Sequence, residues 1–152
     1  MILNIFTSGF SPEADLLLVG VRTHTGECKL WRDSEGFLDY FLKTDDKIVI
    51  GFNILKFDIP FLLLKSQKSQ KFPEFFKKIN YSNVVDLFPI LTFRNRGVIK
   101  GLEFYLEKEG IRKDFLSDLE IARKSKEDSI AQEVGKKLEA INSLYWRLKG
   151  KG

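Results

Sequence analysis

The stretch from residue 47 to residue 65 constrains the fold more than any other part of the chain. It begins with the apolar run Lys47–Phe52 (KIVIGF), which predicts a buried strand, and it continues through a turn at Asn53. Phe57–Lys65 then has the composition of a helix, with Pro60 in the first turn, where proline is well tolerated. An apolar strand that passes through a short turn into a helix is typical of α/β proteins.

The rest of the chain predicts four more strands and several helices. The expected strands are Met1–Thr7, Asp15–Thr23, Glu27–Arg32 and Val84–Leu87, and the first three form an antiparallel meander. The expected helices are Ser34–Leu42 with Ser34 as its N-cap, Phe72–Ile79, Leu102–Glu109 ended by Gly110, and about Ser129–Lys149. This order predicts an α/β fold of three layers, in which helices flank a central mixed five-stranded sheet. We interpret residues 1–152 as a single domain.

The composition excludes only a few classes of protein and site. The 25 basic and 21 acidic residues give a net charge of +4, which permits nucleic-acid binding without requiring it. With one cysteine, Cys28, and one histidine, His24, the chain has no internal disulfide and no structural zinc site. No apolar run reaches the roughly 20 residues that cross a membrane. We expect a cytoplasmic protein that does not associate with membranes.

The constraining stretch carries a motif. Eight positions match the second exonuclease motif of the family B DNA polymerases and their free-standing relatives: Gly51, Phe52, Asn53, Phe57, Asp58, Pro60, Phe61 and Leu62. The chain therefore resembles the DEDD superfamily of 3′–5′ exonucleases, which implies an RNase H-like fold. In this pattern Ile48 and Ile50 are buried in the strand, the turn exposes Asn53, and Asp58 lies near the start of a helix, where the helix dipole favours a carboxylate.

The resemblance breaks at the catalytic residues. The family holds two Mg²⁺ or Mn²⁺ ions with four acids, and the first motif is Asp-x-Glu-Thr on the first strand. Here Asn4 stands in the Asp position and Phe6 in the Glu position. The third motif is Tyr-x-x-x-Asp or His-x-x-x-Asp on the last helix, and it aligns with Glu133 and Lys137. Of the four acids only Asp58 remains.

This loss predicts a protein without nuclease activity and without a metal cofactor. Two divalent cations need several carboxylates to offset their charge, and one Asp beside an amide, a phenyl ring and a lysine does not supply them. The alternative is an active metal-dependent 3′–5′ exonuclease, with Mg²⁺ or Mn²⁺ in a rearranged site or in a site that a partner completes.

Two hypotheses remain for a non-catalytic domain. The first is a module that binds single-stranded DNA or RNA, or a DNA polymerase or repair protein. Its candidate nucleic-acid-binding residues are three that lie where the family meets the 3′ end and three in a basic loop: Asn53, Phe57, Phe61, Arg94, Arg96 and Lys100. A second basic stretch contains Lys65, Lys68 and Lys71. Ordinary solvated loops are the alternative interpretation of both basic stretches.

The second hypothesis is an assembly module that uses the fold as a protein-binding surface. Phe72, Phe75 and Phe76 would then contact a partner, although the ordinary packing of a short helix is the favoured interpretation of these residues.

The absence of metals predicts a rearrangement around Asp58. An unpaired, partly buried carboxylate is costly, so we expect Lys137 to reach Asp58 directly or through one water. Asn4 would donate its amide to the same carboxylate, and Phe6 would pack nearby and exclude water. The alternative is that Lys137 extends to solvent while Asp58 only caps its helix.

Overall fold

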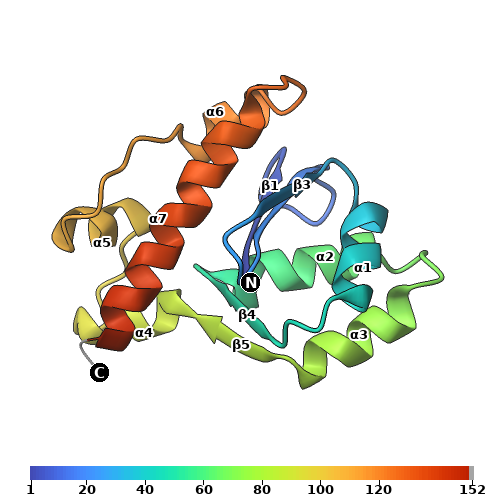
Figure 1. Cartoon of the computed structure of the whole chain (residues 1–152), viewed down its shortest axis with the longest axis horizontal. Helices are drawn as coiled ribbons and strands as arrows, with labels where there is room; N and C mark the ends of the chain where they lie inside the picture. Colours follow the sequence, from blue (N-terminus) through green and yellow to red (C-terminus); the bar gives the residue numbers. More distant parts are fainter. Residues whose placement is uncertain (151–152) are drawn as a thin grey trace.

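The computed structural model describes residues 1–150 and centres on a mixed five-stranded sheet (Figure 1). The strands are β1 (Ile2–Thr7), β2 (Leu16–Arg22), β3 (Cys28–Trp31), β4 (Ile48–Gly51) and β5 (Asn83–Asp86). Their order across the sheet is β3-β2-β1-β4-β5; β1, β2 and β3 are antiparallel, and β4 is parallel to both β1 and β5. The predicted antiparallel meander and the mixed sheet are confirmed.

Helices cover both faces of the sheet, which gives the three layers of an RNase H-like fold (Figure 1). One face packs against α1 (Ser34–Lys43), α2 (Ile59–Lys65) and α3 (Phe72–Tyr81). The other face packs against α4 (Leu87–Arg94), α5 (Leu102–Lys108), α6 (Asp118–Arg123) and α7 (Ile130–Gly150). Side chains alternate along β1, so Ile2 and Phe6 enter the α7 core while Leu3 and Ile5 enter the α1–α3 core.

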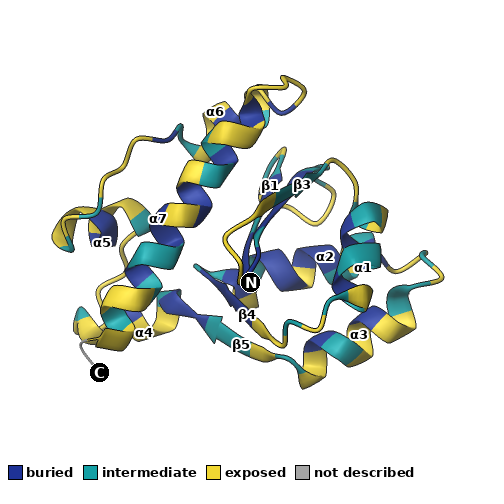
Figure 2. Ribbon diagram, viewed as in Figure 1, coloured by how far each residue is buried: buried dark blue, intermediate teal, exposed yellow. Residues whose placement is uncertain are grey.

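The long helix α7 lies across the sheet and buries one stripe. Figure 2 shows buried residues on its inner side and exposed residues on its outer side, as the predicted helical spacing requires. Gly20 on β2 permits the close approach, because a Cβ atom there would lie 2.6 Å from the Cγ1 atom of Val134. Among the helices of residues 1–150, none combines the length and apolar character needed to cross a bilayer.

Three local expectations are wrong. The N-cap of α1 is Asp33, whose carboxylate accepts from the Gly36 N–H at 2.8 Å, and not Ser34. Ile48 is 42% exposed at the start of β4, whereas the next residue, Val49, is fully buried. The sequence reading also missed α4 and α6, so Arg94 ends a helix and does not lie in a loop.

The turn after β4 is shaped by two residues that tolerate little change. A Cβ atom on Gly51 would lie 2.4 Å from the Ile54 side chain and 2.8 Å from the Leu3 carbonyl oxygen, so only glycine fits. Asn53 follows in the left-handed conformation, with φ at 61°. The chain then enters a π-helical turn, η1 (Ile54–Asp58), which leads directly into α2. Such turns are rare and frequently lie at functional sites.

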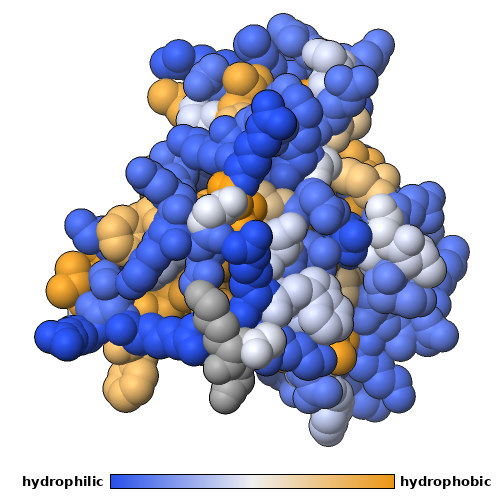
Figure 3. Space-filling view, turned by 60° about the vertical axis from the view of Figure 1, so that its left-hand side comes forward, coloured by the Kyte–Doolittle hydropathy of each residue, from blue (hydrophilic) through white to orange (hydrophobic). Residues whose placement is uncertain are grey.

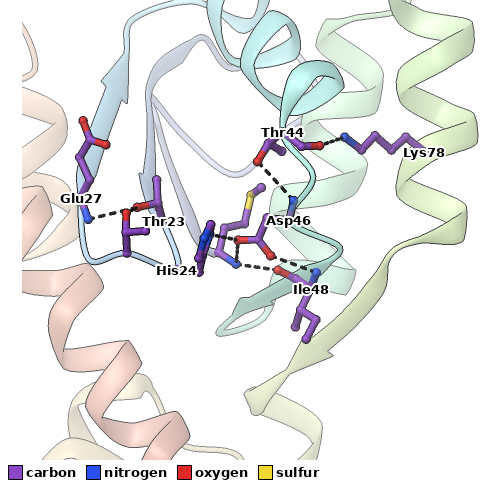
Figure 4. A network of polar contacts seen from close by, with 9 residues as sticks. Thr23, His24, Glu27, Thr44, Asp46, Ile48 and Lys78 are labelled. Atoms are coloured by element: carbon purple, nitrogen blue, oxygen red, sulfur yellow. Dashed lines mark hydrogen bonds and ion pairs between the residues drawn. The ribbon is translucent and has the colours of Figure 1, made fainter.

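The connection from α1 to β4 is held by Asp46 and Thr44 (Figure 4). The Asp46 carboxylate accepts from the Met1 amino group at 2.7 Å and lies 3.8 Å from His24 Nδ1. The Asp46 N–H donates to Thr44 Oγ1, and Lys78 donates to the Thr44 carbonyl at 2.6 Å. These contacts fix the start of β4 and therefore the position of the turn that follows it.

Candidate functional site

The positions that correspond to the exonuclease acids meet in one pocket. Asn4, Asp58 and Lys137 all line a cavity of about 530 Å³ beside the carboxyl ends of β1 and β4. Phe6 is buried beneath it, with its ring 5.1 Å from the Lys137 ammonium. These residues come from β1, η1 and α7, so only the folded chain brings them together.

Asp58 closes a gap in the sheet. Because β4 ends at Gly51, it does not extend beside Ile5, and the Ile5 N–H donates to the Asp58 carboxylate at 2.8 Å. Burial raises the pKa of Asp58 from 3.8 to about 7, against the opposing effects of the Ile5 hydrogen bond and the nearby Lys137. Asp58 therefore titrates near neutral pH.

The direct contact expected between Lys137 and Asp58 is wrong, whereas a contact through one water stays a prediction. The Lys137 ammonium donates to Asp118 Oδ1 at 2.5 Å, and residues 1–150 contain no ion pair between Lys137 and Asp58. The lysine does not extend freely to solvent either, because it is 7% exposed and lies over the Phe6 ring. The Asn4 amide donates to the Ile5 carbonyl at 2.8 Å, so the expected bond to Asp58 is also wrong. The close packing of Phe6 is confirmed.

The side chains of this pocket do not form a donor set for two divalent cations. Mg²⁺ and Mn²⁺ bind oxygen ligands, whereas Phe6 offers none and Lys137 brings a positive charge. Over residues 1–150, no three His, Cys, Asp or Glu side chains gather in a way that could hold a metal ion. Three acidic residues line the pocket, and two of them are already paired: Asp118 with Lys137, and Glu103 with Lys113 at 2.7 Å. The third is Asp58.

Asp86 positions the turn that forms one wall of the pocket. Its buried carboxylate accepts from the backbone N–H groups of Asn53 at 2.7 Å, Leu55 at 3.0 Å and Phe88 at 3.0 Å. It therefore joins the end of β5 to η1 and caps α4. Asn53 lines the same pocket, and its buried side-chain oxygen has no partner among the described residues.

Aromatic side chains form the apolar part of the pocket. Phe10, Phe52 and Phe57 line it, and Phe10 and Phe57 meet edge to face at 5.8 Å. Phe10 is 92% exposed and available to a ligand. Phe61 is not available, because it is 5% exposed within the α1–α3 core and does not line the pocket. Its predicted role in stacking on bases is therefore wrong.

The three basic candidates do not converge on the pocket. Arg94, at the end of α4, lies in a shallow hollow beside Tyr105, and Arg96 lies in the following turn with φ at 58°. Lys100 lies over the Phe104 ring at 5.3 Å and immediately precedes Gly101, which lines the pocket. The basic segment thus flanks the pocket and does not enter it.

The second basic stretch is largely occupied by internal contacts. Lys71 pairs with Glu35 at 3.2 Å and with Asp39 at 3.6 Å, and Lys65 lies over the Phe61 ring at 5.3 Å.

The aromatic cluster on α3 is divided between core and surface. Phe75 is buried, whereas Phe76 is half-exposed and packs against Phe72 at 5.9 Å. The ordinary packing interpretation holds for Phe75.

Sequence reasoning missed Asp86 and Asp118 as residues of the site. Asp118 lies in the first turn of α6, where the Ser117 hydroxyl accepts from the Glu120 N–H at 3.3 Å. The pattern Ser117-x-x-Glu120 is a capping signal, and it would have predicted this helix. Nothing in the sequence pairs Asp118 with Lys137, because the contact depends on how α6 packs beside α7.

Comparison with known proteins supports the fold and leaves the function open. The chain matches no protein-family model and no curated protein. Among solved structures it is similar to the family B DNA polymerase from the hyperthermophilic archaeon Pyrobaculum calidifontis, with a TM-score of 0.65 and 15% sequence identity. The match covers 95% of this chain and 24% of the polymerase chain. The shared fold is the same one that the exonuclease motif predicted.

Proposed function

We propose that this protein is a nuclease-like domain of DNA metabolism that binds nucleic acid or a polymerase or repair partner without cleaving a substrate. One observation carries the proposal: a buried lysine, Lys137, lies where the resemblance expects a metal-binding acid, and it is paired with Asp118. An ammonium in this position repels a divalent cation and occupies part of the space that a metal would need. The proposed compartment is the cytoplasm.

The pocket supports retained binding of a single strand. Phe10 and Phe57 offer aromatic surfaces on which bases stack, a contact worth about 1–3 kcal/mol per base. Asn53 lines the same pocket. Lys100, which directly precedes Gly101 in the pocket lining, is suited to a phosphate beside the pocket, and Arg96 belongs to the same basic segment.

Binding is tested with a fluorescent oligothymidine strand and anisotropy at several salt concentrations. We expect R96A with K100A to weaken binding and to reduce the slope of log affinity against log salt by about 1–2. The matched control is K77A with K126A, which removes the same charge from exposed positions outside both basic stretches. Equal losses in both pairs, or no binding at all, would remove nucleic acid from the proposal.

A second candidate is an active metal-dependent exonuclease with a rearranged site or one completed by a partner. The presence of Asp118 beside Asp58 favours it, because the pocket gains an acid that the motif did not predict. The test is digestion of a 3′-labelled strand with Mg²⁺ or Mn²⁺. The non-catalytic proposal expects no cleavage above that of D58N, and cleavage that D58N abolishes would establish the second candidate.

A further inference from the structure

Exposed apolar side chains gather on α4 and the segment that follows it, away from the Asp58 pocket. Phe93 is 87% exposed, and Ile90, Val98, Ile99 and Leu55 are also exposed. Figure 3 turns the α4–α5 side forward and shows apolar residues at the lower left among hydrophilic ones. A cluster of this kind marks an interaction surface more often than single exposed residues do.

Several of these side chains line one groove of about 500 Å³, here called the α4 groove. Its apolar lining consists of Leu55, Phe88, Pro89, Phe93 and Ile99. The groove lies between η1, α4 and residues 97–99, so it is built from segments that follow the carboxyl ends of β4 and β5.

The walls of the α4 groove are fixed before any partner arrives. The Asp86 carboxylate holds the Leu55 and Phe88 N–H groups, which joins η1 to α4. On the other wall the Asn95 amide donates to the Val98 carbonyl at 2.9 Å, and the Gly97 N–H donates to the Thr92 carbonyl at 2.8 Å. A preformed groove avoids much of the ordering cost of binding.

The charges around the groove all have one sign. Between Leu87 and Gly101 the ionisable residues are Arg94, Arg96 and Lys100, and Lys56 lines the groove from η1. The one acid in the lining, Asp86, is turned inward onto three N–H groups. A basic rim attracts an acidic partner, whereas a second copy of this groove would place like charges together.

The interior favours apolar side chains over nucleobases. Besides the charged groups of Lys56 and Asp86, the side chains of the lining carry one polar group, the buried hydroxyl of Thr92. A base needs hydrogen bonds along its edge, which this lining does not supply. We propose that the α4 groove binds a short acidic segment of a partner protein, which inserts apolar side chains between Leu55, Phe93 and Ile99.

The test begins with selection of random 12-residue peptides on the whole protein. We expect the selected peptides to combine Asp or Glu with two apolar residues three or four positions apart. A synthetic consensus peptide is then measured by fluorescence anisotropy. F93A with I99A should weaken its binding at least about tenfold, because the exposed anchors of the groove are removed. The matched control, F76A with Y81A, removes two exposed aromatic rings from α3 and should change affinity less than about twofold.

Four results would overturn the proposal. The selected peptides carry no acidic enrichment, or they bind both double variants equally. Alternatively, oligothymidine displaces the peptide and itself loses affinity in F93A with I99A, which assigns the groove to nucleic acid. Finally, the protein dimerises in sedimentation experiments and F93A with I99A alone makes it monomeric, which assigns the groove to a second copy. The two apolar substitutions leave Arg96 and Lys100 in place, so this test and the oligonucleotide test above fail independently.

Discussion

Two buried carboxylates near the carboxyl ends of neighbouring strands are used in different ways. Asp86, at the end of β5, accepts three backbone N–H groups and so holds a turn, a helix cap and one wall of the α4 groove. Asp58, at the end of η1, accepts one backbone N–H from Ile5 and faces the pocket, with its pKa raised by burial to about 7. The difference shows that Asp86 builds the site, while Asp58 remains an incompletely satisfied group within it.

The largest expected effect is from removal of Asp86. D86A leaves three backbone N–H groups without their acceptor, so we expect it to lower the free energy of unfolding by about 3–5 kcal/mol. D86N keeps one acceptor oxygen, so it should lower the free energy of unfolding less than D86A does. Urea unfolding measures both, with the exposed D128A as the control that should change stability by less than about 0.5 kcal/mol. A loss in D86A no larger than in D128A would contradict the structural role.

The next largest effect is the pH dependence of stability that Asp58 causes. The pKa of Asp58 is about 7 in the folded protein, whereas an ordinary aspartate, as in the unfolded chain, has a pKa of 3.8. Between pH 4 and pH 7 the folded state therefore keeps a proton that the unfolded state has lost. The contribution of Asp58 to stability consequently falls as the pH rises from 4 to 7.

D58N removes this titration and keeps an oxygen to accept the Ile5 N–H. Relative to the parent, we expect it to gain a few kcal/mol of stability between pH 4 and pH 7. If the free energies of unfolding of D58N and the parent change by the same amount from pH 4 to pH 7, Asp58 is not the titrating group.

The smallest expected effect on stability is from K137M. The substitution removes a buried ammonium and its pair with the exposed Asp118, two changes that nearly offset each other, so stability should change by about 1 kcal/mol or less. Loss of the nearby positive charge should nevertheless raise the pKa of Asp58 further. Carbon-13 NMR titration of the Asp58 carboxyl measures this shift, and K136M, which removes an exposed lysine on the same helix, is the control that should not move it.

The fold could be predicted well because its signals are local. Alternation and apolar runs located all five strands, and the spacing of Ile130, Val134 and Leu138 located α7. α4 was missed because Leu87–Arg94 is apolar on all sides of its helix and has no amphipathic period.

The site could be predicted only in part, because its contacts depend on packing. The motif alignment brought Asn4, Asp58 and Lys137 to one pocket correctly, since the fold is conserved in outline. The partner of Lys137 could not be predicted, because Asp118 lies on a short helix whose position depends on the Glu133 carboxylate accepting the Leu116 N–H. Phe61 is buried and therefore does not reach a ligand, and the sequence alone could not reveal this burial.

The central claim is that the Asp58 pocket does not hold divalent cations, and paramagnetic relaxation by Mn²⁺ tests it most directly. Two-dimensional amide NMR spectra are recorded while Mn²⁺ is added in small steps to the whole protein. We predict that the Ile5 and Asp58 amide signals broaden no more than those of residues far from the pocket. Saturable broadening centred on Ile5 and Asp58, and absent in D58N, would contradict the account.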